Sequence, residues 1–178
     1  MTISDDSTTT RIRLLDTVSD AQQRELAAVL ADCVDGGASV SFMQPLTEDR
    51  AQAFWRRVAD GVASGERALL VAEDDEGILG TVQVVLAQPE NQPHRGEVSK
   101  MLVHRRARRR GIGALLMQAA ERVARERGKT LLVLDTSSAD AERLYERSGW
   151  VRVGSIPGFA LLPQGEPCDT TFFYRELK

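Results

Sequence analysis

A basic turn with two glycines stands between two apolar segments near the middle of the chain. Its sequence, RRRGIG, covers residues 108–113; it follows the apolar run 98–103 and precedes a helical pattern that begins at Ile112. A helix N-terminus has about four backbone N–H groups without intrahelical partners and carries a partial positive charge. Glycine lets a ligand approach the backbone, and arginine adds a cationic fork that matches phosphate. The turn therefore predicts an anion site, with pyrophosphate as the best-fitting ligand.

Two common phosphate-binding loops do not match these residues. A dinucleotide-binding fingerprint would need a third glycine at position 116, which is Leu116 here. A P-loop would need Gly-Lys followed by Ser or Thr, and this sequence is absent from the turn. What remains is Arg-x-x-Gly-x-Gly after a strand.

This remaining pattern resembles the acetyl-coenzyme A binding motif of the GNAT superfamily of N-acetyltransferases. The string ARRRGIGALLMQAAERVARERG is similar to that family's pyrophosphate loop and the helix that follows it. Downstream, AERLYERSGW resembles the family's tyrosine-bearing helix, and the strand-like TLLVLDT separates the two matches. The ordered set covers roughly residues 97–151, about a third of the chain. More loosely, HRGEVSKMLVHRRARRRGIG resembles bacterial members near the tabtoxin-resistance acetyltransferases.

The resemblance implies that acetyl-CoA is the co-substrate and lies between two strands that separate. Its pantetheine arm would pair with the main chain of the first strand, and the glycine-containing loop would hold its pyrophosphate. These two roles fall on Met101, Leu102 and Val103 for the arm, and on Arg108, Arg109, Arg110, Gly111, Ile112, Gly113 and Ala114 for the pyrophosphate. Either Arg105 or Arg109 could also reach the ribose phosphate. Ser138 stands where many members have a cofactor-contacting asparagine, and a hydroxyl has a different reach and donor pattern.

The chemistry implied by the resemblance is direct attack of an amine on the acetyl thioester. A lysine-like amine with a pKa of about 10.4 is neutral in only about one molecule in 2,500 at pH 7, so a base matters. Glu97 opens the strand that would face the thioester and is the first candidate base. Asp135 ends the neighbouring strand and would bind the substrate ammonium or assist as base. The alternatives to a catalytic role are structural: Glu97 would be an exposed residue at a strand end, and Asp135 would be a turn or cap residue.

The thiolate that departs from the acetyl group must also be protonated. Tyr145 matches the family's tyrosine that donates a proton or a hydrogen bond to the sulfur of coenzyme A. A phenol pKa of about 10 keeps this side chain protonated at neutral pH, as a general acid requires. The alternative for Tyr145 is aromatic packing on the apolar face of a helix.

Composition favours one folded domain and argues against several other classes of protein. The chain has 178 residues, 42% hydrophobic content, a net charge of -3 at pH 7 and a pI of about 5.5. An acidic chain argues against general nucleic-acid binding, although the arginines of 105–110 leave a local nucleic-acid patch as an alternative. Cys33 and Cys168 have no metal-ligand or Cys-x-x-Cys spacing, so no metal is expected. The polar N-terminus and the lack of a membrane-spanning apolar run favour a cytoplasmic protein.

Hydrophobic patterning and capping residues predict the elements that must position these groups. Ser19 with Gln22 predicts a capping box for a first helix that ends at Gly36-Gly37, and Thr47 predicts the cap of a second helix. The other expected elements are strands at 11–18, 68–72, 78–86 and 98–103, a helix at 112–127, a strand at 131–134, a helix at 139–147, and strands at 150–156 and 171–175. Together with the resemblance, this order predicts an α/β fold of GNAT type, a mixed sheet of six or seven strands with helices on both faces.

Residues 1–10 are expected to form a flexible tail, and residues 11–178 a single acetyltransferase domain. The acceptor pocket would be built by 36–45 and by a Pro/Gly-rich loop at 157–169, with Phe42, Met43 and Phe159 as an apolar wall or as lid packing. The leading function is acetyl transfer to a primary amine of a small molecule or an amino acid, without a nucleic-acid or membrane partner. The alternatives are acetylation of a protein N-terminus or lysine, a non-catalytic acyl-CoA-binding module, and nucleic-acid binding through the arginines. Family habit also allows a homodimer.

Overall fold

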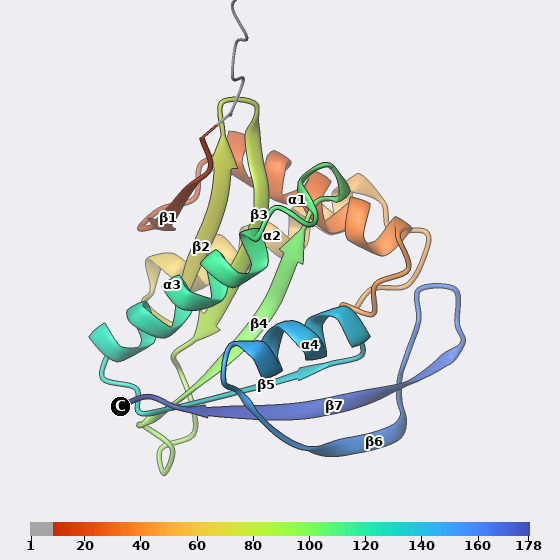
Figure 1. Ribbon diagram of the computed structural model, residues 1–178. Helices are drawn as coiled ribbons and strands as arrows, with labels where there is room; N and C mark the ends of the chain where they lie inside the picture. Colours follow the sequence, from red (N-terminus) through yellow and green to blue (C-terminus); the bar gives the residue numbers. More distant parts are fainter. Residues whose placement is uncertain (1–8) are drawn as a thin grey trace, which may run out of the picture.

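A seven-stranded mixed sheet runs through the described part of the chain, and helices cover both of its faces (Figure 1). The computed structural model describes residues 9–178, so most of the expected tail at 1–10 lies outside the described residues. The strand order is β1-β2-β3-β4-β5-β7-β6, in which β4 and β5 are parallel and the other neighbouring pairs are antiparallel. The expected mixed sheet with helices on both faces is confirmed.

The elements follow one another in the predicted order. In chain order they are β1 (Arg11–Leu15), α1 (Asp20–Asp35), α2 (Glu48–Ala63), β2 (Arg67–Asp74), β3 (Gly77–Val85), β4 (Arg95–Val103), the 3-10 helix η1 (Arg105–Ala107), α3 (Ile112–Glu126), β5 (Leu131–Thr136), α4 (Ala139–Arg147), β6 (Val151–Leu161) and β7 (Pro167–Glu176). The helices lie within one residue of their predicted bounds. The differences concern β1, which ends three residues earlier than predicted, β4, which begins three residues earlier, η1, which the pattern does not predict, and the last two strands.

The first two helices begin at the capping residues that the sequence indicates. The Ser19 hydroxyl accepts a hydrogen bond from the Gln22 N–H at 3.2 Å, and the Gln22 side chain accepts one from the Ser19 N–H at 2.9 Å. The Thr47 hydroxyl accepts from the Arg50 N–H at 3.3 Å. Each cap satisfies a backbone donor that the helix leaves unpaired and stabilises its helix by about 1 kcal/mol.

The region 157–169 is not the loop that the sequence predicts. It forms the distal part of a long hairpin, because β6 runs to Leu161 and β7 starts at Pro167. The prediction was wrong because proline and glycine were interpreted as loop residues, whereas Pro157 and Gly158 lie at a register irregularity of the edge strand β6. An edge strand tolerates proline there, since its N–H need not join the ladder.

Two apolar layers fix the helices to the sheet. One layer joins α3 and α4 to one sheet face and includes Trp150, which is 4% exposed. The other joins α1 and α2 to the opposite face and includes Trp55, which is fully buried. Both tryptophans are therefore core residues.

Candidate functional site

The parallel strands β4 and β5 are paired at one end only. Their register joins Arg95 to Leu131, Gly96 to Leu132 and Glu97 to Val133. Beyond these pairs β4 continues to residue 103 and β5 to residue 136, and Figure 1 shows the two strands separating into a V. We call this region, residues 98–103 of β4 and 134–136 of β5, the strand divergence. Among residues 9–178, no strand pairs with this edge of β4 beyond Glu97.

A bulge in β4 accompanies the separation. The register between β3 and β4 shifts between Thr81 and Gln83, and Lys100 has a left-handed φ of 51°. A bulge bends its strand and increases the local twist, which re-aims the side chains beyond it. Met101 and Val103 then pack against the α3/α4 layer, and Leu102 belongs to the α1/α2 layer. Leu102 is buried and the other two side chains are partly buried in packing, so these residues would meet a ligand chiefly through their main chain.

The glycine-containing turn begins α3 without a capping side chain. Gly111 occupies the N-cap position with a left-handed φ of 74°, and a Cβ added there would meet nothing within 4 Å. The first helical hydrogen bond runs from the Leu115 N–H to the Gly111 carbonyl at 3.2 Å, so the preceding N–H groups have no helical acceptor. Gly113 serves packing instead, because an added Cβ would lie 3.0 Å from Leu144 of α4. The turn thus presents open backbone donors at the N-terminus of a 15-residue helix.

Two arginines that precede the turn form ion pairs with carboxylates. The Arg105 backbone donates to Asp32 at 2.9 Å, and its guanidinium also pairs with that carboxylate. The Arg106 guanidinium lies 3.4 Å from Asp74 and 3.3 Å from Glu76. The Asp32 contact draws Arg105 toward α1, which favours Arg109 over Arg105 for a ribose phosphate.

The three arginines of the turn itself are exposed. Arg108 donates to the Val103 carbonyl at 3.3 Å, and Arg110 donates to the Thr10 hydroxyl at 3.3 Å. Arg109 has a left-handed φ of 61°, two residues before the left-handed Gly111. The acceptors of Arg108 and Arg110 are a carbonyl and a hydroxyl, so neither contact neutralises the positive charge of the turn.

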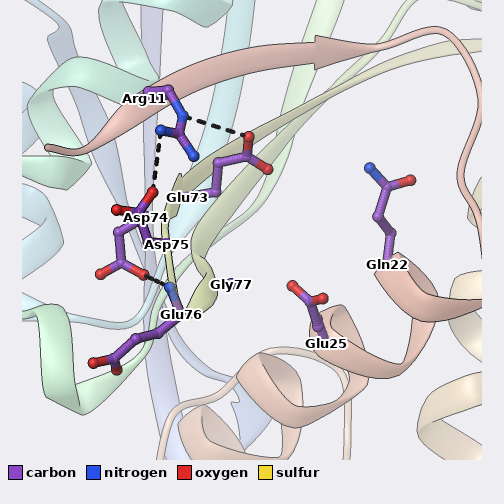
Figure 2. A pocket seen from close by; sticks show the side chains of 8 residues that line it. All are labelled: Arg11, Gln22, Glu25, Glu73, Asp74, Asp75, Glu76 and Gly77. Carbon is purple, nitrogen blue, oxygen red and sulfur yellow. Dashed lines mark hydrogen bonds and ion pairs between the residues drawn. The ribbon is translucent and has the colours of Figure 1, made fainter. Parts of the chain in front are cut away.

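A hollow of about 470 Å³ lies between α1 and the β2–β3 turn, and it is lined by Asp74 and Glu76, the two partners of Arg106 (Figure 2). Figure 2 shows Glu25 on α1 across the hollow from the acidic turn 73–76. Its carboxylates brace the hairpin: Glu25 accepts from the Ile78 N–H at 2.8 Å, and Asp74 accepts from the Glu76 N–H at 3.0 Å. The excess of negative charge disfavours phosphate in this hollow.

A second hollow, of about 340 Å³, lies beside the start of α3, between α3 and α4. It is lined by Ala114, Gln118, Glu121, Leu144, Arg147, Ser148 and Arg175. Its buried carboxylate, Glu121, accepts from the Trp150 indole at 3.1 Å and lies 3.6 Å from Arg175. These contacts hold α3, β7 and Trp150, which lies between α4 and β6, in a fixed arrangement around the hollow.

Tyr145 lies on α4 and is 4% exposed. Its ring packs against Trp150 and Phe173, with centroids 6.0 and 5.8 Å apart. Burial, and secondly the charge of Asp135, raise the pKa of Tyr145 far above its usual range. The aromatic packing and a protonated phenol therefore occur together. At the start of α4, the Ser138 hydroxyl is exposed and accepts from the Ala141 N–H at 3.2 Å as an N-cap.

The two candidate carboxylates flank the strand divergence. Glu97 is the last residue of β4 that pairs with β5, its side chain is 46% exposed, and it lies 3.6 Å from Arg95. Asp135, near the end of β5, is exposed and accepts from the buried Thr170 hydroxyl at 3.1 Å. The negative charges of Asp135 and Glu97 both raise the pKa of a third residue, Lys100.

Lys100 is the residue at this site that the sequence reasoning missed. Its ammonium donates to the Ser41 hydroxyl at 3.1 Å and lies 5.8 Å from the centre of the Phe54 ring. Burial lowers the pKa of Lys100 and outweighs the opposing effect of the nearby carboxylates. The available sequence signal was a charge inside the apolar run 98–103.

The segments expected to line the acceptor pocket meet in the structure. Ser39 donates to the Leu161 carbonyl at 3.1 Å, and the Gln44 N–H donates to the Pro163 carbonyl at 2.9 Å, which joins 36–45 to the β6–β7 hairpin. Of the expected wall, Phe42 packs edge-on against Phe54 of α2 at 5.3 Å, and Phe159 packs edge-on against Phe172 of β7 at 5.7 Å. Met43 is 39% exposed.

Metal-ligand clusters and membrane-spanning helices are absent from the residues described. Within 9–178, no group of three or more His, Cys, Asp or Glu side chains could hold a metal ion. No helix in this range is long and apolar enough to cross a membrane. Cys33 is buried, Cys168 is half-buried, and both are free thiols.

Known acetyltransferases are similar to this chain in sequence and in fold. The model of the acetyltransferase (GNAT) family matches residues 37–150. An N-acetyltransferase from Staphylococcus aureus Mu50 is 20% identical, with a TM-score of 0.79 over 96% of this chain and 99% of that chain. A phosphinothricin acetyltransferase from Sinorhizobium meliloti, solved with acetyl-CoA, is 19% identical, with a TM-score of 0.79 over 95% and 89%. A ribosomal-protein-alanine N-acetyltransferase from Brucella melitensis is 26% identical, with a TM-score of 0.75 over 94% and 99%.

Proposed function

The chain belongs to the GNAT family of acetyltransferases, and from this premise we propose that it transfers the acetyl group of acetyl-CoA to a primary amine of a small molecule or an amino acid. The observation that carries the proposal is the strand divergence, which lies next to the uncapped start of α3. The Sinorhizobium meliloti structure, which shares this fold, contains acetyl-CoA. An open strand edge beside a helix N-terminus suits a ligand that has an amide-bearing arm and a pyrophosphate.

The cofactor would occupy two adjoining parts of this chain. The main chain of 101–103 would pair with the amides of the pantetheine arm, since their side chains are already used in packing. The turn, residues 108–114, would hold the pyrophosphate with its open N–H groups and its exposed arginines. The left-handed Gly111 supports this role, because a side chain there would stand in open space that the phosphate needs. Ser138 would add one hydroxyl contact.

Transfer requires one bond to form and one to break. The amine nitrogen attacks the thioester carbonyl carbon, and the carbon–sulfur bond breaks. Glu97 or Asp135 would receive the amine's proton, directly or through water, since both flank the strand divergence. Tyr145 would give its proton to the departing sulfur. The raised pKa of Tyr145 means that the phenol is protonated at neutral pH, so it has an O–H to donate to the departing sulfur, while its weak acidity favours a hydrogen bond over complete proton transfer.

A second candidate function is acetylation of a protein N-terminus. The similarity to the Brucella melitensis ribosomal-protein-alanine N-acetyltransferase favours it. The hydrogen bonds that join 36–45 to the β6–β7 hairpin argue for a small acceptor, since an extended peptide would need an open groove between these segments. We therefore rank the small amine first.

The test measures release of free thiol from acetyl-CoA in the presence of three acceptor classes. These are amino acids and other small primary amines, peptides with a free N-terminus, and N-terminally blocked peptides that contain lysine. We expect turnover with the first class. Turnover confined to either peptide class would instead assign a protein acetyltransferase. Binding of acetyl-CoA without thiol release in all three would indicate an acyl-CoA-binding module.

A further inference from the structure

Lys100 is an ammonium group without an ion-pair partner among residues 9–178. No carboxylate oxygen of that range lies within 4.0 Å of the Lys100 ammonium, whereas the arginines nearby have such partners. Its nearest polar and aromatic partners, Ser41 and Phe54, are both neutral. Withdrawing an ammonium from water is costly unless a charged partner compensates, and the lowered pKa of Lys100 reflects that cost. An anionic ligand would therefore supply the close ion-pair partner that residues 9–178 do not.

The backbone around this ammonium is strained on both sides of its hydrogen bond. Lys100 has a φ of 51° and its acceptor Ser41 has a φ of 76°, and neither residue is glycine. Left-handed non-glycine residues are held only where the surrounding structure enforces them, and they gather at ligand sites. One of the two lies in the β4 bulge and the other between α1 and α2. The bulge aims the ammonium at the sheet face that α2 covers.

Charges of both signs meet beside the strand divergence. Asp135 and Glu97 act on the pKa of Lys100 from beyond ion-pair distance. The ammonium has three donors and uses one on Ser41, so two remain for a ligand. A molecule that carries both an ammonium and a carboxylate would complement such a surface, with its ammonium toward the two carboxylates and its carboxylate toward Lys100.

We propose that Lys100 binds a carboxylate of the acceptor, so that the acceptor is an amino acid or a similar molecule bearing both an amine and a carboxylate. This inference rests on the proposed function, since it names the acceptor class of the same site. Lys100 is then a specificity-determining residue, and Ser41 holds its ammonium in place. If Lys100 served only to fasten 36–45 to β4, removal of its charge and removal of the Ser41 hydroxyl would have equal effects.

The kinetic test compares amino acids with the matching amino-acid amides as acceptors. For the wild-type protein, with rates expressed per neutral amine because the α-amine of an amino acid is more basic than that of its amide, we expect kcat/KM to favour the amino acids by about tenfold to a hundredfold, which is the usual effect of a charge-assisted hydrogen bond. Lys100→Met should bring this ratio close to one. Ser41→Ala, which removes the fastening contact and keeps the cation, should retain most of the preference. A wild-type ratio near one, or equal loss in both variants, would overturn the proposal.

A second readout does not depend on turnover. The chain contains only three lysines, Lys100, Lys129 and Lys178, so lysine labelled with ¹³C at Cε gives three side-chain signals, and Lys100→Met assigns one of them. A mixture of N-acetyl amino acids should shift the Lys100 signal and raise its pKa, whereas the matching amides should not. Lys129, which donates to the carbonyls of Leu86 and Pro93, is an internal control.

The two readouts separate the two claims. If no amine is acetylated but the carboxylates shift the Lys100 signal, carboxylate binding at Lys100 stands, while the proposed acetyl transfer fails and the bound carboxylate is no acetyl acceptor. If amines are acetylated and the Lys100 signal does not respond to any carboxylate, acetyl transfer stands and the acceptor inference is wrong.

Discussion

The two sides of the strand divergence are built in different ways. The side proposed for acetyl-CoA comes from short, continuous segments, chiefly 101–103 and 108–114, and offers mainly backbone groups. The side proposed for the acceptor joins single residues from distant parts of the chain, such as Ser41, Lys100 and Asp135. A backbone site needs glycine and a helix start, which tolerate few substitutions, whereas a side-chain site can be rebuilt one residue at a time. The difference suggests that changes on the first side remove binding or transfer, and changes on the second redirect specificity.

The largest effect is expected from Tyr145→Phe, which removes the proposed proton donor. Loss of a general acid typically lowers turnover by about 10² to 10⁴. We expect kcat to fall within this range while the Kd for acetyl-CoA changes little, because the ring still packs against Trp150 and Phe173. The matched control is Tyr174→Phe, which changes the only other tyrosine, half-buried on β7. Unchanged turnover in the Tyr145 variant would remove this residue as the acid.

The pH profile of the wild-type protein gives a companion check. Burial raises the pKa of Tyr145, so the phenol remains protonated when pH passes about 10, where an ordinary tyrosine ionises. Ionisation of Tyr145 should therefore cause no fall in rate between about pH 8 and pH 10. The wild-type protein and Tyr145→Phe should have the same profile shape over this range. A basic limb near pH 10 that disappears in the variant would mean that the phenol titrates normally.

The next effect is expected from valine at Gly111. A β-branched residue at a φ of 74° strains the turn and fills the open space beside it, so acetyl-CoA affinity should fall by about tenfold to a hundredfold. Gly128→Val is a matched control at the other end of α3, with a φ of 75° and no atom within 4 Å of an added Cβ. Both variants should lose stability in thermal melts, and only the first should lose affinity in titrations. Equal affinities would contradict the assignment of the turn.

A smaller effect is expected from Glu97→Gln and Asp135→Asn. Each should lower kcat by about tenfold at pH 7 with a basic amine, because fewer acceptor molecules are neutral without a base. The deficit of the variant that has lost the base should shrink as pH approaches the pKa of the amine, which then needs no help. A loss of the same size at every pH would mean that the carboxylate positions the acceptor. Comparing the two profiles identifies which residue is the base.

The smallest effect is expected within the arginines. Arg109→Met should weaken acetyl-CoA binding by a few fold and reduce its dependence on salt, since an exposed phosphate contact contributes modestly. Arg106→Met should leave acetyl-CoA affinity unchanged and lower stability instead, because it leaves Asp74, 6% exposed, without its guanidinium. Titration of both variants at two salt concentrations, together with their melting curves, checks this division.

The sequence predicts the proposed cofactor side better than the acceptor side for a physical reason. The start of α3 is a local event: Gly111 and the apolar period after it lie within one segment, so both the helix and the open N-terminus follow from them. Helix caps at Ser19 and Thr47 are equally local and are confirmed. Tyr145 and the β4 edge came from the family resemblance, which supplies the proposed roles that local pattern cannot.

The features that sequence could not predict depend on contacts between distant residues. In the sequence, Lys100 is a single charged residue within an apolar run. The neighbouring residues do not indicate the bulge that turns its side chain toward Ser41, 59 positions away. Pro157 and Gly158 read as loop residues, since their place on an edge strand is set by pairing with β7. The ion pair of Arg105 with Asp32 could not be predicted for the same reason, because the two residues are 73 positions apart.

The most direct test of the central claim is a calorimetric titration of the protein with acetyl-CoA, repeated with a double-stranded DNA oligonucleotide at low and raised salt. The account predicts saturable one-to-one binding of acetyl-CoA and no comparable binding of DNA. Absence of acetyl-CoA binding, together with DNA binding that weakens steeply as salt rises, would contradict it and assign the arginines of 105–110 to nucleic acid.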